Sequence, residues 1–171
     1  MKRGLIEVGK SENNDQSILE ENVIKYLKDH RQCVIGTSLN DTPFVAKVYY
    51  YYISNYELVF STFSHLNKFK NILKNPKIAI FIDDGSPANC LHYQGTAELI
   101  TSHEEIDKLR EYILTQDPPF RKFMKRSDIK FFKVKPHTIY YTDYQKKLFY
   151  RDVLKLDNNM HITEVNNERI F

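Results

Sequence analysis

The chain has 171 residues, which fits one domain of ordinary size. Its 42% hydrophobic and 27% charged residues exclude a disordered protein, and its net charge of +3 is too low for a dedicated nucleic-acid binder. The two cysteines lack Cys-x-x-Cys spacing, which favours reduced, buried thiols in a cytoplasmic protein. The first residues lack the apolar stretch of a signal peptide, and no apolar run is long enough to cross a bilayer.

The beginning of the chain predicts a flexible arm followed by a helix. Residues 1–16 are polar and rich in asparagine, and we expect them to form the arm. Ser17-Ile18-Leu19-Glu20 has the spacing of a capping box, in which a hydroxyl and a carboxylate satisfy the first amides of a helix. Apolar residues then recur every four positions, at Leu19, Val23 and Leu27. This period predicts a helix that runs to about His30.

Short strands, separated by turn residues, dominate the rest of the chain. Alternating aromatic and β-branched residues predict strands over 32–38, 44–53, 57–62, 78–82, 91–100, 129–134, 138–141 and 147–154. Connections such as Asn40-Asp41 are too short for parallel crossovers, so neighbouring strands should be antiparallel. A short helix is predicted before Pro76, and another between the capping box at Ser102 and Pro118-Pro119.

The predicted fold is mainly β, a closed antiparallel barrel of six or seven strands with about three short helices. No internal repeat or low-complexity linker divides the chain. Residues 17–156 are therefore expected to form the barrel domain. Residues 157–171 are expected to form a C-terminal tail.

One segment places hydroxyls at the end of a strand and a lysine at the start of the next helix. Ser61 and Thr62 end the third predicted strand, and Lys68 falls in the first turn of the short helix. A helix start offers free amides and a partial positive charge, and the lysine adds a full charge, so the place suits a phosphate. These residue types are common, so the segment taken alone also describes an ordinary capped surface helix.

The order of these pieces resembles the pyridoxamine 5′-phosphate oxidase-like, FMN-binding split-barrel family. The matching pieces are Ser61-Thr62, Lys68, Asn71-Ile72, Asn75-Pro76 and Ile78-Ala79-Ile80, with Pro43-Phe44-Val45-Ala46-Lys47-Val48 upstream and Tyr93-Gln94-Gly95-Thr96-Ala97-Glu98-Leu99 downstream. The resemblance covers about 19–151 and is closer to small bacterial members than to a genuine pyridoxamine phosphate oxidase. The latter ends in a tryptophan- and arginine-rich segment, whereas this chain has no tryptophan. Vitamin B6 oxidation is therefore not expected.

The resemblance implies a homodimer of split barrels that holds FMN in clefts between its two subunits. It also implies an oxidoreductase that acts on a small-molecule substrate. In the family, the flavin phosphate is bound by strand-end hydroxyls and the helix lysine, which correspond here to Ser61, Thr62 and Lys68. Lys47 corresponds to a position near the flavin ring or phosphate.

Five further residues are assigned to the cofactor site. Asn67 lies on the short helix and could reach the phosphate, whereas Asn71 could instead brace the turn. Phe120, Arg121 and Tyr144 follow the Pro118-Pro119 break and flank the final strands, where the second subunit could use them to wall the cleft. Packing at the barrel end is the alternative role for these three residues.

One alternative function stays open. The same scaffold could be a non-enzymatic module that binds haem, a deazaflavin or a flavin. The run Tyr49-Tyr50-Tyr51-Tyr52 could stack nucleic-acid bases, but strand alternation sends its members to opposite faces, one in the core and one over an interface or cleft. The six histidines lack metal-binding spacing. We therefore expect no nucleic-acid partner, no membrane partner and no metal site.

Overall fold

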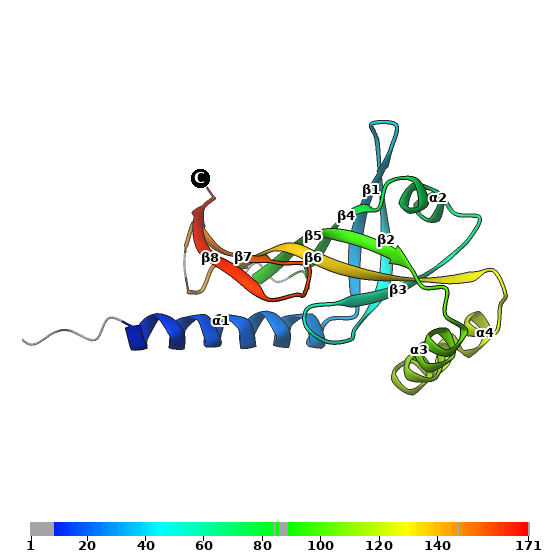
Figure 1. Cartoon of the computed structure of the whole chain (residues 1–171), viewed down its shortest axis with the longest axis horizontal. Helices are drawn as coiled ribbons and strands as arrows, with labels where there is room; N and C mark the ends of the chain where they lie inside the picture. The colour runs from blue at the N-terminus through cyan, green and yellow to red at the C-terminus, as the bar shows by residue number, and fades with distance from the viewer. Residues whose placement is uncertain (1–8, 84, 86–88, 147, 171) are drawn as a thin grey trace, which may run out of the picture.

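Six antiparallel strands close into a barrel in the computed structural model, which describes residues 9–83, 85, 89–146 and 148–170, with side chains from Asp15 onward (Figure 1). The strands pair in the order β3-β2-β1-β4-β5-β6, and β3 also pairs with β6, which closes the barrel. Their bounds are β1 (Gln32–Leu39), β2 (Thr42–Tyr52), β3 (Leu58–Phe63), β4 (Lys77–Asp83), β5 (Asn89–Leu99) and β6 (Ile129–Asp143).

The main core fills the barrel with large aromatic and branched side chains. Tyr50, Phe60, Tyr93 and Phe132 are buried there. The Tyr93 hydroxyl lies 2.8 Å from the carbonyl oxygen of Tyr56 and 3.0 Å from that of Val134, so its polar atom is satisfied inside the core. The helix α1 (Gly9–Asp29) contributes the apolar residues of its second half to the same core.

A second, smaller core lies outside the barrel. The helices α3 (His103–Gln116) and α4 (Arg121–Met124), joined by the 3₁₀ helix η1 (Pro118–Phe120), pack against the outer side of β2, β3 and β6. Tyr51, Val59 and Phe131 meet Ile113 and Met124 in this core. The packing fixes η1 and α4 beside the end of β3, while α2 (Asn67–Lys74) connects β3 to β4.

The sheet continues beyond the barrel. The strands β7 (Tyr150–Leu156) and β8 (Ile162–Arg169) add to β6, and the first half of α1 extends away from the barrel alongside them (Figure 1). None of the helices in the described part of the chain combines the length and apolar character that a membrane-spanning helix needs.

The predicted fold class is confirmed, but several element bounds differ from the expectation. The first helix begins at Gly9, so Ser17 lies inside it and half of the expected arm is helical. The strands expected over 129–134 and 138–141 are one strand, because Pro136 lies where the register shifts beside Gly95 and needs no ladder hydrogen bond. A Cβ at Gly95 would lie 2.1 Å from the Lys135 carbonyl oxygen, so only glycine fits this close approach. The expected tail contains β8.

Candidate functional site

A cleft of about 220 Å³ lies at the end of β3, between β2, α2 and α4. Five of the residues selected from the sequence line it: Lys47, Ser61, Thr62, Lys68 and Phe120. They come from four different elements, and closure of the barrel together with the second core brings those elements together. The cleft is therefore a product of the tertiary fold.

Aromatic rings form one wall of this cleft. Phe120 contacts Tyr49 edge-on, with ring centroids 5.1 Å apart, and lies 5.9 Å from Phe123. Phe123 in turn lies 6.4 Å from Phe63. The rings pack against one another in the tilted and edge-on arrangements that aromatic pairs prefer. The cleft thus has an aromatic side and, around Lys68 and the β3 hydroxyls, a polar and cationic side.

The polar side includes the first turn of α2. Its N-cap residue is Leu66, whose apolar side chain cannot accept a hydrogen bond from the free amides of that turn. Lys68, the second residue of the helix, is partly buried, and this desolvation lowers the pKa of its ammonium group. An anion placed here would receive the free amides and the positive charge together.

Thr62 has a buried hydroxyl without a hydrogen-bond partner among the residues that the structure describes. Its side chain is only 5% exposed, yet it lines the cleft. An unsatisfied buried polar atom costs about 1–3 kcal/mol, so native structures rarely keep one without a function. A ligand oxygen that reached this hydroxyl would satisfy it.

The other residues selected from the sequence lie outside the cleft lining within one chain. Asn67 is exposed at the start of α2, and Arg121 is exposed beside Phe120. Asn71 is buried and donates a 3.2 Å hydrogen bond to the Thr37 hydroxyl on β1, which is the bracing role considered for it. Tyr144 follows Asp143 at the end of β6, far along that strand from Ile129, which lines the cleft.

Several lining residues could not be assigned to a site from the sequence. Phe63, Leu66, Phe123 and Met124 all contribute to the cleft. Each belongs to an apolar or aromatic pattern that predicts core packing equally well. Their role depends on where α4 rests on the barrel, and no local spacing encodes that placement.

These features define a closed antiparallel barrel with a cleft that suits an anionic group at one side and a planar ring at the other. The sequence profile described as pyridoxamine 5′-phosphate oxidase matches residues 19–143, and the chain belongs to this family. The resemblance seen in the sequence is thereby confirmed. No curated protein sequence matches the chain.

Solved structures of similar fold come from several bacteria. A pyridoxamine 5′-phosphate oxidase-related, FMN-binding protein from Nostoc punctiforme is 13% identical, with a TM-score of 0.64, and the match covers 98% of this chain and all of that one. An FAD-binding protein from Mesorhizobium loti is 14% identical, with a TM-score of 0.59 and coverage of 70% and 90%. ChuZ from Campylobacter jejuni is 16% identical, with a TM-score of 0.72 and coverage of 86% and 62%. At these identities the likeness concerns the fold.

The bracing role of Asn71 gives a first prediction. Asn71→Ala removes the donor to the Thr37 hydroxyl and leaves a small gap, so it should lower the free energy of unfolding by about 1–3 kcal/mol in urea denaturation. Asn67→Ala changes an exposed asparagine four residues earlier and should stay within about 0.5 kcal/mol of the unmodified protein. Equal effects of the two substitutions would show that Asn71 does not brace the fold.

Proposed function

We propose that the protein binds FMN in this cleft as a homodimer and acts as an oxidoreductase on a small-molecule substrate. The observation that carries the proposal is the buried Thr62 hydroxyl, without a partner among the described residues, at the same cleft as the partly desolvated Lys68. A phosphate would give the Thr62 hydroxyl a hydrogen-bond partner and the Lys68 ammonium group a counter-ion, which would offset the free energy that their burial costs.

The polar side of the cleft fits the phosphate of FMN. Lys68 would donate a charge-assisted hydrogen bond, and the hydroxyls of Ser61 and Thr62 would donate to phosphate oxygens. The uncapped first turn of α2 adds main-chain amides and the positive end of the helix dipole. Lys47, on β2, lines the same cleft and adds a second positive charge.

The aromatic side fits the flavin ring. Tyr49 and Phe120 present ring surfaces beside the cationic end, so a planar ring attached to a phosphate could contact both sides at once. The names of two relatives support a flavin, since the protein from Nostoc punctiforme is described as FMN-binding and that from Mesorhizobium loti as FAD-binding.

A second copy of the chain would complete the site. The cleft of about 220 Å³ is smaller than the roughly 300–1,000 Å³ of typical cofactor sites, so one chain would leave part of the flavin uncovered. Exposed apolar residues lie on the outer face of β2, β1 and β4 beside the cleft. Val45, which is 68% exposed, pairs with Gly36, and Gly36 pairs with the exposed Ala79. Such a flat apolar face favours burial against a partner.

Residues of the second copy would then cover the part of the flavin that one chain leaves exposed. We expect Arg121 and Tyr144 to act in this way, because within a single chain neither lines the cleft. Bound FMN supplies hydride and electron transfer. The chain's own residues hold the phosphate, orient the ring and exclude water from it.

The phosphate contact predicts a difference between two flavins. FMN should bind more tightly than riboflavin, which lacks the phosphate. Lys68→Ala should weaken the binding of FMN by about 1.5–3 kcal/mol and leave the binding of riboflavin nearly unchanged. Lys70→Ala, an exposed lysine on the same helix, is the matched control and should retain the FMN affinity. Fluorescence titration of the three proteins with each of the two flavins measures these affinities. Equal affinity for FMN and riboflavin in the unmodified protein would exclude a phosphate site, and absence of binding would exclude the cofactor.

The desolvated lysine predicts a pH dependence. Protonated Lys68 binds the phosphate, so its contribution to the preference for FMN over riboflavin is complete below its pKa and is lost as the pH rises through it. Because burial lowers this pKa, the loss should begin at a lower pH than for an ordinary lysine with a pKa near 10.5. Lys68→Arg keeps its charge and should retain the preference at high pH. Identical pH profiles for the two proteins would show that Lys68 does not carry the contact.

The apolar face predicts the oligomeric state. Light scattering at micromolar concentration should give twice the chain mass of 20.4 kDa. Val45→Asp places a charge in the proposed interface and should give monomers with weakened FMN binding. Leu73→Asp, at an exposed leucine on α2, should remain dimeric. A monomeric unmodified protein would contradict the shared site.

The oxidoreductase assignment predicts flavin reduction. FMN-loaded protein mixed with NADH or NADPH in a stopped-flow instrument should lose its flavin absorbance at a useful rate. Tight FMN binding without reduction by either donor would indicate a carrier instead. Competition of FMN with haem and with a deazaflavin, measured on one sample, decides among the three ligands of the shared cleft.

A further inference from the structure

The cationic residues of the chain gather at the end of the molecule that holds the cleft. The segments 61–77 and 118–130, which include α2 and α4, together hold nine of the 25 cationic residues and one of the 22 acidic residues. The rest of the chain is therefore net negative, although the whole chain has a net charge of +3. Both helices lie at the end opposite to β7, β8 and the first half of α1 (Figure 1). Such an uneven distribution attracts anions to the cleft end.

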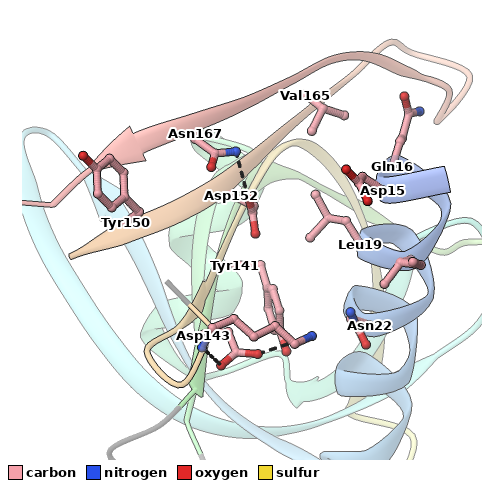
Figure 2. A pocket seen from close by; sticks show the side chains of 12 residues that line it. Asp15, Gln16, Leu19, Asn22, Tyr141, Asp143, Tyr150, Asp152, Val165 and Asn167 are labelled. Carbon is pink, nitrogen blue, oxygen red and sulfur yellow. Dashed lines mark hydrogen bonds and ion pairs between the residues drawn. The ribbon is translucent and has the colours of Figure 1, made fainter. Parts of the chain in front are cut away.

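At the opposite end, the charged groups have partners within the chain. A cavity of about 740 Å³ lies there, between the first half of α1 and one face of the β6–β7–β8 extension (Figure 2). Asp143 accepts hydrogen bonds from the main-chain amides of Gln145 and Lys146 and lies 3.5 Å from the Lys146 ammonium group. Asp152 accepts a 2.9 Å hydrogen bond from Asn167. These carboxylates are therefore already compensated.

Several cations beside the cleft lack an acidic partner. Lys70 on α2, Lys122 on α4 and Lys125 directly after α4 are exposed and form no ion pair with the residues that the structure describes. On the neighbouring helix α3, by contrast, Lys108 lies 2.6 Å from the Glu104 carboxylate. Like charges that gather without counter-ions repel one another, so a bound anion would stabilise this end of the molecule.

An aromatic ring and an oriented guanidinium group accompany these cations. Phe123 lines the cleft, yet its side chain is 48% exposed, and it stands between two of the unpaired lysines in the sequence. The guanidinium carbon of Arg126 lies 4.7 Å from the centroid of the Phe63 ring. Its Nε and Nη2 atoms donate hydrogen bonds of 2.9 and 2.8 Å to the Asp128 carboxylate. These contacts fix the guanidinium group and leave Nη1 without a partner among the described residues.

We propose that the α4 face, formed by Lys122, Phe123, Lys125 and Arg126, binds the adenosine phosphate end of NADPH, which is the hydride donor for the cleft. The phosphate groups pair with the three cations, and adenine stacks on the Phe123 ring. NADPH carries one phosphate more than NADH, so the cations favour NADPH. Transfer of a hydride from NADPH to FMN, with uptake of one proton from water, gives reduced FMN and NADP⁺. This role rests on the proposed function, because it names the donor for FMN bound in the cleft.

A matched pair of probes tests the phosphate requirement. Adenosine 2′,5′-bisphosphate and adenosine share a base and a sugar but differ in charge, and each is titrated calorimetrically into the full-length protein with and without FMN. We expect saturable binding of the bisphosphate and at least about tenfold weaker binding of adenosine. The difference should shrink in 1 M salt, where the Debye length is about 3 Å.

Three results of these titrations would overturn the α4 face as a nucleotide site. The first is equal binding of the two probes, or no saturable binding of the bisphosphate. The second is loss of bisphosphate binding when FMN is present, which would place the probe in the phosphate site beside Lys68. The third is tighter binding of single-stranded oligoadenylate DNA than of the bisphosphate at the same salt concentration, which would indicate a nucleic-acid surface instead.

Variants test where the bisphosphate binds. The double variant Lys122→Gln/Lys125→Gln should weaken the bisphosphate by about tenfold or more, and it should lower the ratio of the flavin reduction rates with NADPH and NADH several-fold. Lys108→Gln removes the same charge from the exposed surface of α3 and should change neither quantity. Unchanged bisphosphate affinity in the double variant would overturn the site.

Failure of this inference and failure of the proposed function give different results. Unmodified protein that binds FMN and is reduced equally fast by NADH and NADPH would contradict the α4 face as a donor site and leave flavin binding intact. Protein that binds the bisphosphate but not FMN would contradict the proposed function and retain the nucleotide site.

Discussion

The pairing of β3 with β6 is the interaction on which the rest of the structure depends. It closes the barrel and aligns Ser61 with Phe131 and Thr62 with Lys130, so the strand-end hydroxyls lie next to the strand that also carries the second core. Phe131 packs in that core with Ile113 and Met124, which sets α4 over the end of β3. An open sheet would leave β3 and the first half of β6 with an unpaired edge and would separate the hydroxyls from the aromatic wall.

Among the described residues, three buried side-chain polar atoms have no hydrogen-bond partner: the Thr62 hydroxyl at the cleft, and the Tyr56 hydroxyl and Arg110 Nε away from it. The hydroxyl of Tyr93 has carbonyl partners inside the barrel, and Tyr51 donates to Asp117 from the second core. Thr62 differs, because its equally buried hydroxyl has no partner within the described residues, and Lys68 is partly desolvated beside it. Sites that bind anions commonly keep unsatisfied or desolvated donors in the free protein, although these donors lower its stability. Donors that are already in place need no rearrangement when the ligand arrives.

The parts of the fold that local chemistry determines could be predicted from the sequence. The N-cap half of the predicted capping box at Ser102 is confirmed, since its hydroxyl accepts a 3.4 Å hydrogen bond from the Glu105 amide, while the Glu105 carboxylate lies 2.6 Å from the Lys133 ammonium group. The residues from Ser61 to Lys68 form one strand–turn–helix unit, so their proximity follows from sequence spacing. By contrast, Phe123 reaches the cleft through the packing of α4, and β8 has the polar sequence Ile-Thr-Glu-Val-Asn-Asn-Glu-Arg, which gives little strand signal. The helix start predicted at Ser17 is wrong, because the polar residues before it, from Gly9 onward, are also helical.

The central claim is that Thr62 and Lys68 hold the phosphate of FMN. A crystal structure of the full-length protein grown with FMN tests it most directly. We expect a phosphate oxygen within hydrogen-bond distance of the Thr62 hydroxyl, another beside the Lys68 ammonium group, and the flavin ring against Tyr49 and Phe120. FMN bound with its phosphate away from Thr62 and Lys68, or bound at a different part of the molecule, would contradict the claim.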